Sequence, residues 1–249
     1  MRAVELDVRR PKPRRPGAGV WFAGAAMGLP LRLLTRERWR GMGHVPATGP
    51  VIVVANHVSS VDACALAVWV YAGAGRSPRF MAKASLWRVP VVRQVFRSAR
   101  QIPVSRGAAD ASAALQPAVA ALSQGEVIVL FPEGGITRDP DRWPMRARTG
   151  AARLALLSGA PVVPVGQWGS DALLHRGWWR RPVASIQAGP RVELGDLVVR
   201  AGGGLEEDLL RAATDRIMDA IAALVAGLRG GHPPALPYDP RAAAPPPPT

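Results

Sequence analysis

The sequence has 249 residues, of which 48% are hydrophobic, and it carries a formal net charge of +14. A chain of this length can bury the core of one domain, and we expect one domain with irregular ends. The single cysteine, Cys64, excludes an internal disulfide framework and favours a reducing compartment. The four histidines lack the spacing of zinc ligands, so we predict no metal site.

The positive charge is concentrated in two stretches. Residues 1–40 hold ten basic and three acidic side chains, and residues 63–106 hold eight basic and no acidic ones. Such stretches attract nucleic acid, an anionic membrane surface or a phosphorylated substrate. A solvated basic face is an equally good interpretation.

The N-terminal residues differ in composition from the rest. Residues 1–16 are rich in Pro and Arg and are predicted to be disordered. The apolar stretch that follows is interrupted by Pro30 and Arg32, and it falls short of the about 20 residues that span a bilayer. We expect residues 17–40 to form a helical anchor in the interface of an anionic membrane. A helix packed on the domain is the alternative.

Strand and helix patterns alternate over residues 41–229, which we assign to the main domain. Strands are predicted at 51–55, 79–82, 101–104, 127–131, 161–168 and within 185–194, and helices at 61–72, 86–98, 110–123, 148–158 and 205–228. This alternation predicts an α/β fold with a mixed, largely parallel sheet flanked by helices. The Pro-rich tail, residues 230–249, is predicted to be disordered.

A polar run, NHVSSVD at residues 56–62, directly follows the first predicted strand. His57 and Asp62 do not share a face of a continuous helix, because five residues rotate by roughly 140°. If His57 lies in a loop and Asp62 in the first helical turn, the carboxylate can fold back onto the imidazole. It would then fix the tautomer and leave the other ring nitrogen as a general base. The alternative is that Ser59 caps the helix, Asp62 completes a capping box, and His57 is an ordinary loop residue.

A second polar run, FPEGGITR at residues 131–138, leaves the strand predicted at 127–131. Such a turn exposes the carboxylate of Glu133 and backbone N–H groups, with Arg138 near enough to meet a phosphate. A tight turn with a solvated glutamate is the alternative. Lys83 and Arg106 follow predicted strands, so we expect both at the same edge as His57 unless they are solvated charges.

Four segments in this order resemble the glycerolipid acyltransferases. NHVSSVD is similar to their NHxxxxD motif and FPEGGITR to their FPEGTRS motif. Residues 83–106 resemble the block between these motifs, and APVVPV, at residues 160–165, resembles the fourth block. Within the family, the resemblance is strongest to bacterial 1-acyl-sn-glycerol-3-phosphate acyltransferases.

The resemblance implies a mechanism. His57 would deprotonate the acceptor hydroxyl, Asp62 would orient His57, and the oxygen would attack the thioester of acyl-CoA or an acyl carrier protein, with no cofactor beyond this co-substrate. Glu133 would position the acceptor, and its phosphate would be held by Lys83, Arg106 and Arg138. The remaining residues that the resemblance assigns to substrate binding are Asn56, Ser59, Phe131, Pro132, Gly134 and Gly135. The sequence departs from the family pattern at Gly135, where Thr is usual, and at Ser105, where an acidic residue often precedes the arginine.

The resemblance therefore implies an enzyme that acylates the sn-2 hydroxyl of 1-acyl-glycerol-3-phosphate and gives phosphatidic acid in phospholipid biosynthesis. We expect it at the cytoplasmic face of the cell membrane as a peripheral or monotopic protein. Another lysolipid or glycerol 3-phosphate is the alternative acceptor. A non-catalytic basic protein that binds membrane or nucleic acid would explain the charge but not the four ordered segments, so we expect no nucleic-acid partner. A serine hydrolase would need a GxSxG motif, which the sequence lacks.

Overall fold

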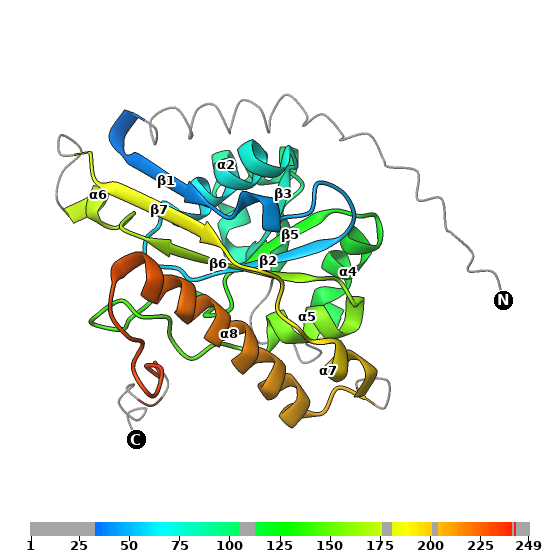
Figure 1. Ribbon diagram of the computed structural model, residues 1–249. Helices are drawn as coiled ribbons and strands as arrows, with labels where there is room; N and C mark the ends of the chain where they lie inside the picture. Colours follow the sequence, from blue (N-terminus) through cyan, green and yellow to red (C-terminus); the bar gives the residue numbers. More distant parts are fainter. Residues whose placement is uncertain (1–32, 105–112, 176–180, 201–203, 241, 243–249) are drawn as a thin grey trace, which may run out of the picture.

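The computed structural model describes residues 33–104, 113–175, 181–200, 204–240 and 242. These residues form one sheet that lies between two layers of helices (Figure 1). The predicted α/β fold, with a mixed and largely parallel sheet flanked by helices, is confirmed.

Seven strands of the described chain form the sheet in the order β1-β7-β6-β2-β5-β3-β4. Every neighbouring pair is parallel except β6 and β7, which run antiparallel. The strands are β1 (Arg36–Arg40), β2 (Val51–Ala55), β3 (Pro78–Lys83), β4 (Ile102–Val104), β5 (Val127–Leu130), β6 (Val162–Trp168) and β7 (Val183–Ala188).

Helices cover both faces of the sheet. Figure 1 shows α2 on one side and α5, α7 and α8 on the other. The α-helices are α2 (Asp62–Ala74), α3 (Pro90–Ser98), α4 (Gln116–Ser123), α5 (Gly150–Ser158), α6 (Ala172–His175), α7 (Gly195–Arg200) and α8 (Glu207–Arg229). The 3-10 helices are η1 (Met42–His44), η2 (Ala84–Arg88) and η3 (Ala113–Leu115).

The central strand β2 contributes to two cores. Ile52 and Val54 pack into the core that includes residues of α4, α5 and α8. Val51, Val53 and Ala55 pack into the core that includes residues of α2. A parallel strand buried on both faces is expected to be continuously apolar, which explains why β2 reads as a hydrophobic run without alternation.

The long helix α8 lies directly against β6. Its buried residues Ile217, Ile221 and Val225 recur every fourth position, which is the spacing of one helix face. At Gly166 of β6, an added Cβ would lie 2.8 Å from the Cβ of Leu224. Glycine at this position therefore allows the helix to approach the strand closely.

The structure differs from the sequence-based expectation at the start of the domain. Residues 36–40 were expected to belong to the helical anchor, but they form β1 and pair in parallel with β7. Their exposure alternates along the strand, and Trp39 packs against the core that contains α2. This pattern is typical of an edge strand with one face on the core, and the pairing with a distant strand outweighs local sequence preference. Of the rest of the predicted anchor, residues 33 and 34 are helical and residues 17–32 lie outside the described residues.

Part of the predicted disordered tail is held in place. The backbone N–H of Arg146 donates to the carbonyl oxygen of Tyr238 at 2.9 Å, and the Arg146 guanidinium pairs with Asp239 at 2.9 Å. Tyr238 and Asp239, which lie in the tail that composition predicts to be disordered, thus contact the main domain. Within the described residues, no helix combines the length and the apolar character needed to cross a bilayer.

Candidate active site

The polar runs meet at one edge of the sheet. Strands β2, β5 and β3 are adjacent and parallel, so their carboxyl ends lie side by side. His57 follows the end of β2, Glu133 follows the end of β5, and Lys83 is the last residue of β3. The carboxyl edge of a parallel sheet is where α/β proteins usually place ligand-binding groups.

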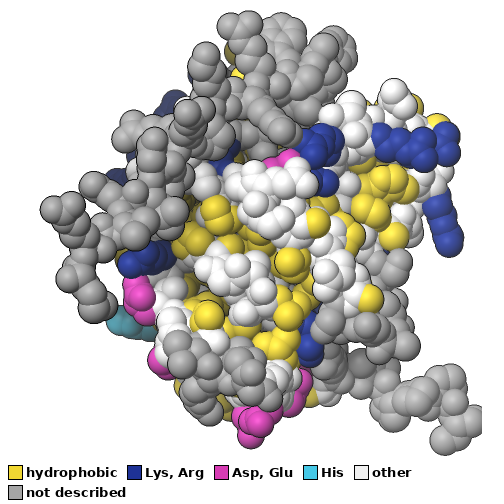
Figure 2. Space-filling model, turned by 90° about the vertical axis from the view of Figure 1, so that its right-hand side faces the viewer, with side chains coloured by type: hydrophobic (Ala, Val, Ile, Leu, Met, Phe, Trp, Pro, Cys, Tyr) yellow, Lys and Arg dark blue, Asp and Glu magenta, His cyan; other side chains and the backbone are white. Residues whose placement is uncertain are grey.

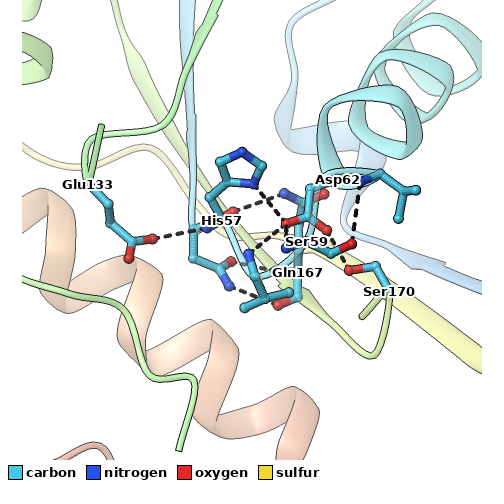
Figure 3. Close-up of polar contacts among 9 residues, drawn as sticks. His57, Ser59, Asp62, Glu133, Gln167 and Ser170 are labelled. Carbon is cyan, nitrogen blue, oxygen red and sulfur yellow. Dashed lines mark hydrogen bonds and ion pairs between the residues drawn. The ribbon is translucent and has the colours of Figure 1, made fainter. Parts of the chain in front are cut away.

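His57 and Asp62 contact each other at this edge. The Nδ1 atom of His57 lies 3.0 Å from the Oδ2 atom of Asp62 (Figure 3). His57 lies in the loop after β2 and Asp62 is the first residue of α2, as the sequence analysis required for such a contact. The Asp62 side chain is fully buried, whereas 15% of the His57 side chain is exposed. The histidine is therefore the member of the pair that a substrate can reach.

The Asp62 carboxylate is fixed by further donors. Its Oδ2 atom accepts the backbone N–H groups of Val58 at 2.6 Å and Ser59 at 2.8 Å. Its Oδ1 atom accepts the hydroxyl of Ser170, which lies in the turn after β6 (Figure 3). Donors on both oxygens hold the carboxylate in one orientation toward the imidazole.

The capping alternative for Asp62 is realised in part. The bond from the Ser59 N–H to Asp62 is one half of a capping box. The reciprocal half differs, because the Ser59 hydroxyl accepts the N–H of Val61, at 3.3 Å, instead of the N–H of Asp62. Asp62 thus helps to start α2 and contacts His57 with the same carboxylate oxygen.

The contact with Asp62 determines which ring nitrogen of His57 is available. A carboxylate accepts hydrogen bonds, so Nδ1 carries the proton and Nε2 keeps a lone pair. The imidazole also stacks on the ring of Phe131, with ring centroids 4.2 Å apart and the planes inclined by 15°. The ring is therefore held at one nitrogen and along one face, with Nε2 able to accept a proton.

Glu133 holds the backbone of His57. Its Oε1 atom accepts the N–H of His57 at 2.9 Å, and its Oε2 atom accepts the N–H of Met145 at 2.8 Å. The carbonyl of His57 in turn accepts the N–H of Thr137 at 2.7 Å. Burial raises the pKa of Glu133 to about 8, and the two backbone N–H bonds act in the opposite direction. With both oxygens engaged and only 6% of the residue exposed, Glu133 positions His57 rather than facing an open site.

Asn56 has a similar positioning contact. Its amide oxygen accepts the backbone N–H of Gln167 at 2.7 Å, and its amide nitrogen donates to the Gln167 carbonyl at 2.9 Å. The Gln167 side chain donates to the Asn56 carbonyl at 3.0 Å. These bonds tie the end of β2 to the end of β6 and use the buried side chain that the resemblance assigned to substrate binding.

Sequence reasoning did not identify Gln167 and Ser170 as site residues. Gln167 is a polar residue at the end of an otherwise apolar strand, and Ser170 follows a glycine in the turn just beyond it. A buried polar residue at a strand end requires a partner, which is the signal that points to Gln167. No comparable local signal identifies Ser170.

The loop between Asp139 and Arg146 is braced by the end of α8. The guanidinium of Arg229 lies over the ring of Trp143, 4.2 Å from its centroid, and over the ring of Trp168, 4.4 Å from its centroid. The same side chain donates to the carbonyl of Asp141 at 2.6 Å. The contacts of Arg146 with Tyr238 and Asp239 extend this brace along the tail. Because Met145 lies in the braced loop and donates to Glu133, the brace supports the segment that holds His57.

The structure describes two of the three predicted phosphate ligands. Lys83 and Arg138 are both exposed, and neither forms an ion pair with any residue that the structure describes. Asp139, the alternative partner of Arg138, accepts the backbone N–H groups of Asp141 and Trp143 instead. Arg106 lies outside the described residues.

The two glycines of the turn after β5 differ in their surroundings. Gly134 has a φ of 77°, a conformation that favours glycine, and a Cβ there would meet Arg148 at 3.3 Å. At Gly135 a Cβ would meet no described atom within 4 Å. The backbone at Gly135 therefore leaves open space for the Cβ of the threonine that is usual in the family pattern. The carbonyl of Pro132, before the turn, accepts the N–H of Arg148 at 3.0 Å.

Comparison with known families identifies the family to which the chain belongs. A family model described as Acyltransferase matches residues 36–168, more than half of the 249 residues. The chain belongs to the Acyltransferase family. The match runs from β1 to the end of β6 and includes His57, Asp62 and Glu133. The resemblance inferred from the four sequence segments is thereby confirmed.

Individual members of the Acyltransferase family are similar over part of their length. The 1-acyl-sn-glycerol-3-phosphate acyltransferase of Borreliella burgdorferi is 29% identical over 126 residues, which cover 50% of this chain and 48% of that protein. The chloroplastic 1-acyl-sn-glycerol-3-phosphate acyltransferase BAT2 of Brassica napus is 24% identical over 140 residues, which cover 55% of this chain and 39% of that protein. The chain thus spans less than half the length of either curated relative.

A solved structure of the Acyltransferase family has the same fold. The crystal structure of the 1-acyl-sn-glycerophosphate acyltransferase PlsC from Thermotoga maritima matches with a TM-score of 0.63 and 23% sequence identity. The match covers 86% of this chain and 81% of that chain. This similarity extends beyond the family model and supports the sheet order and helix layers described above.

Proposed function

We propose that the protein transfers a fatty acyl group from acyl-CoA or an acyl carrier protein to the sn-2 hydroxyl of 1-acyl-glycerol-3-phosphate. The observation that carries the proposal is the contact between His57 and the buried, fully bonded Asp62 at the sheet edge. Two curated relatives are named for transfer to this acceptor, which supports its choice. Another lysolipid or glycerol 3-phosphate remains the alternative acceptor.

The proposed reaction uses the free ring nitrogen of His57. Nε2 accepts the proton of the acceptor hydroxyl while the oxygen attacks the thioester carbonyl carbon and forms a tetrahedral intermediate. The carbon–sulfur bond then breaks, and the imidazolium returns its proton to the departing thiolate. Asp62 stabilises the imidazolium between these two steps and keeps Nδ1 protonated. No covalent acyl-enzyme forms.

The acceptor phosphate is proposed to lie against basic side chains at the same edge. Lys83 and Arg138 are exposed there and carry charges that described acidic residues do not neutralise. Arg106 is proposed as a third ligand on the basis of the resemblance. We place the enzyme at the cytoplasmic face of the cell membrane, where its lipid acceptor would lie.

Acyl transfer by the purified full chain tests the proposal. The chain is supplied with a thioester donor and a panel of lysolipids, and the products are measured by mass spectrometry. His57→Ala should lose at least about 100-fold in turnover, because a general base typically contributes that much. His44→Ala, which removes an exposed imidazole from η1, is the matched control and should keep normal activity. A near-normal rate for His57→Ala would refute the mechanism.

Asp62 can be tested separately from the fold. Asp62→Asn should reduce turnover nearly as strongly as His57→Ala, because an amide no longer selects the Nδ1–H tautomer. If Asp62 had only a structural role, the unfolding free energy would fall, because its bonds with Val58, Ser59 and Ser170 are disturbed, but activity in the folded fraction would be normal. Circular dichroism on the same samples separates these outcomes. If the protein transfers no acyl group but binds nucleic acid with an affinity that falls steeply as the salt concentration rises, the result would instead favour a nucleic-acid-binding protein.

A further inference from the structure

The segment that joins β3 to β4 exposes an amphipathic helix. It contains η2 (Ala84–Arg88) and α3 (Pro90–Ser98), and together with Val89 and with Lys83, the last residue of β3, it is called the η2–α3 segment, residues 83–98. All nine residues of α3 are described, and none of them is buried, although apolar and polar residues separate strongly around the helix. An amphipathic helix normally gains its stability by burying its apolar face. Within the part of the chain that the structure describes, the apolar face of α3 is only partly covered.

Aliphatic side chains of the η2–α3 segment point into solvent. Leu86 is 41% exposed, Val89 is 49% exposed and Val91 is 75% exposed. Trp87 and Phe96 pack edge to face with ring centroids 4.8 Å apart, and this contact holds η2 against α3. The segment therefore presents an apolar ridge on a folded support.

Basic side chains surround this ridge. The exposed cations of the segment, whose side chains form no ion pair or hydrogen bond with a described residue, are Lys83, Arg88, Arg93 and Arg97. Neighbouring cations differ, since Arg79 and Arg100 both pair with Glu126. The sequence from residue 63 to residue 106 contains no acidic residue. Figure 2 shows the same kind of segregation on the face it draws, with Lys and Arg around hydrophobic side chains at the upper right and most Asp and Glu at the lower left and bottom.

We propose that the η2–α3 segment docks on an anionic lipid bilayer. The aliphatic ridge would enter the interface, and the cations would contact the headgroups. A nucleic acid would neutralise the cations but offers no apolar phase for Val91, so the combination favours lipid. Because η2 begins directly after β3, docking would bring the bilayer to the sheet edge that carries His57. The inference extends the proposed function, although docking itself requires no acyl transfer.

Vesicle co-sedimentation of the full chain, without an acyl donor, tests whether the positive charge of the η2–α3 segment contributes to docking. Neutral phosphatidylcholine vesicles are compared with vesicles that also contain phosphatidylglycerol. The double variant Arg93→Gln with Arg97→Gln should bind the anionic vesicles about 25-fold more weakly, since each basic residue contributes about fivefold, or about 1 kcal/mol. The matched control, Arg191→Gln with Arg216→Gln, removes the same charge from residues paired with Glu193 and Asp196 and should bind as the wild type does. Equal loss in both variants, or no loss in either, would overturn the proposal.

A fluorescent probe tests insertion directly. An environment-sensitive fluorophore is attached to Val91→Cys, and separately to Leu236→Cys, in a chain in which Cys64→Ala removes the native thiol. Leu236 is 83% exposed and lies in the tail, so it is an apolar control outside the segment. The probe at position 91 should shift to the blue with anionic vesicles, and the probe at position 236 should not. An unchanged signal at position 91, which is also the result if another part of this chain covers the ridge, would overturn the proposal.

Failure of docking and failure of the proposed function are distinguishable. If the double variant at Arg93 and Arg97 loses vesicle binding as expected but the unmodified chain transfers no acyl group in detergent, the docking proposal is supported and the enzyme proposal fails. If acyl transfer in detergent is normal and the vesicle experiments fail, the reverse holds.

Discussion

Glu133→Gln should change how the stability of the protein depends on pH. Burial raises the pKa of Glu133 from its ordinary 4.5 to about 8 in the folded chain. Between these two pH values the folded chain keeps a proton that the unfolded chain has released. The contribution of Glu133 to the unfolding free energy is therefore fully present below the pKa of the unfolded chain and is lost as the pH rises through the pKa of the folded chain.

The size of this effect follows from the shift. A difference of about 3.5 pKa units corresponds to at most about 5 kcal/mol of unfolding free energy, lost between about pH 4.5 and about pH 8. This shift is what remains of the effect of burial after the bonds from the N–H groups of His57 and Met145, which favour the carboxylate, have offset part of it. A glutamine has nearly the same shape and does not ionise, so the variant should lack this pH dependence.

Urea denaturation between about pH 5 and about pH 8 measures the effect. The unfolding free energy of the wild type should fall relative to that of Glu133→Gln as the pH rises. Glu193→Gln, at a side chain that is 80% exposed, is the matched control and should follow the wild type. A difference that is independent of pH would mean that the two backbone bonds outweigh burial and that Glu133 is ionised in the folded protein.

Substitutions at Ser170 and at Arg138 are expected to have distinct effects. Ser170→Ala should lower the unfolding free energy by about 1.5 to 3 kcal/mol, because it removes a hydrogen bond to a buried carboxylate, and should reduce turnover less than His57→Ala does. Urea denaturation measures the stability and initial rates measure the turnover. Ser170→Thr, which keeps a hydroxyl, should restore both. An unchanged unfolding free energy in Ser170→Ala would contradict the assigned bond. Arg138→Ala should raise the acceptor Michaelis constant by roughly one to two decades, with little change in the donor constant and little further loss with a neutral monoacylglycerol. Steady-state kinetics with both acceptors measure this, and constants that stay at wild-type values would make Arg138 a solvated turn residue.

The elements that sequence predicted well are those whose pattern is local. The apolar run of β2 and the four-residue spacing of Ala213, Ile217 and Ile221 in α8 reflect burial, and burial leaves a direct trace in the local sequence. The contact of His57 with Asp62 was also expected, since it depends on a loop followed at once by a helix. Their catalytic roles remain predictions.

The features that sequence missed depend on long-range contacts. β1 has the polar sequence RERWR, and only its pairing with β7, more than a hundred residues away, makes it a strand. The bonds of Ser170 with Asp62 and of Gln167 with Asn56 join residues 108 and 111 positions apart. Glu133 was expected to face the acceptor, because the pattern around it does not reveal the two N–H groups that occupy its oxygens.

The contacts that the end of α8 makes with the loop between Asp139 and Arg146 can form only late in the synthesis of the chain. The ribosome makes His57 and Glu133 long before Arg229, Tyr238 and Asp239. Until those last residues are available, the loop that donates to Glu133 lacks the Arg229 contacts and the Arg146 contacts. A nascent chain that already contains all four acyltransferase sequence segments therefore still lacks these contacts. They can form only when the C-terminal part has folded back onto the domain.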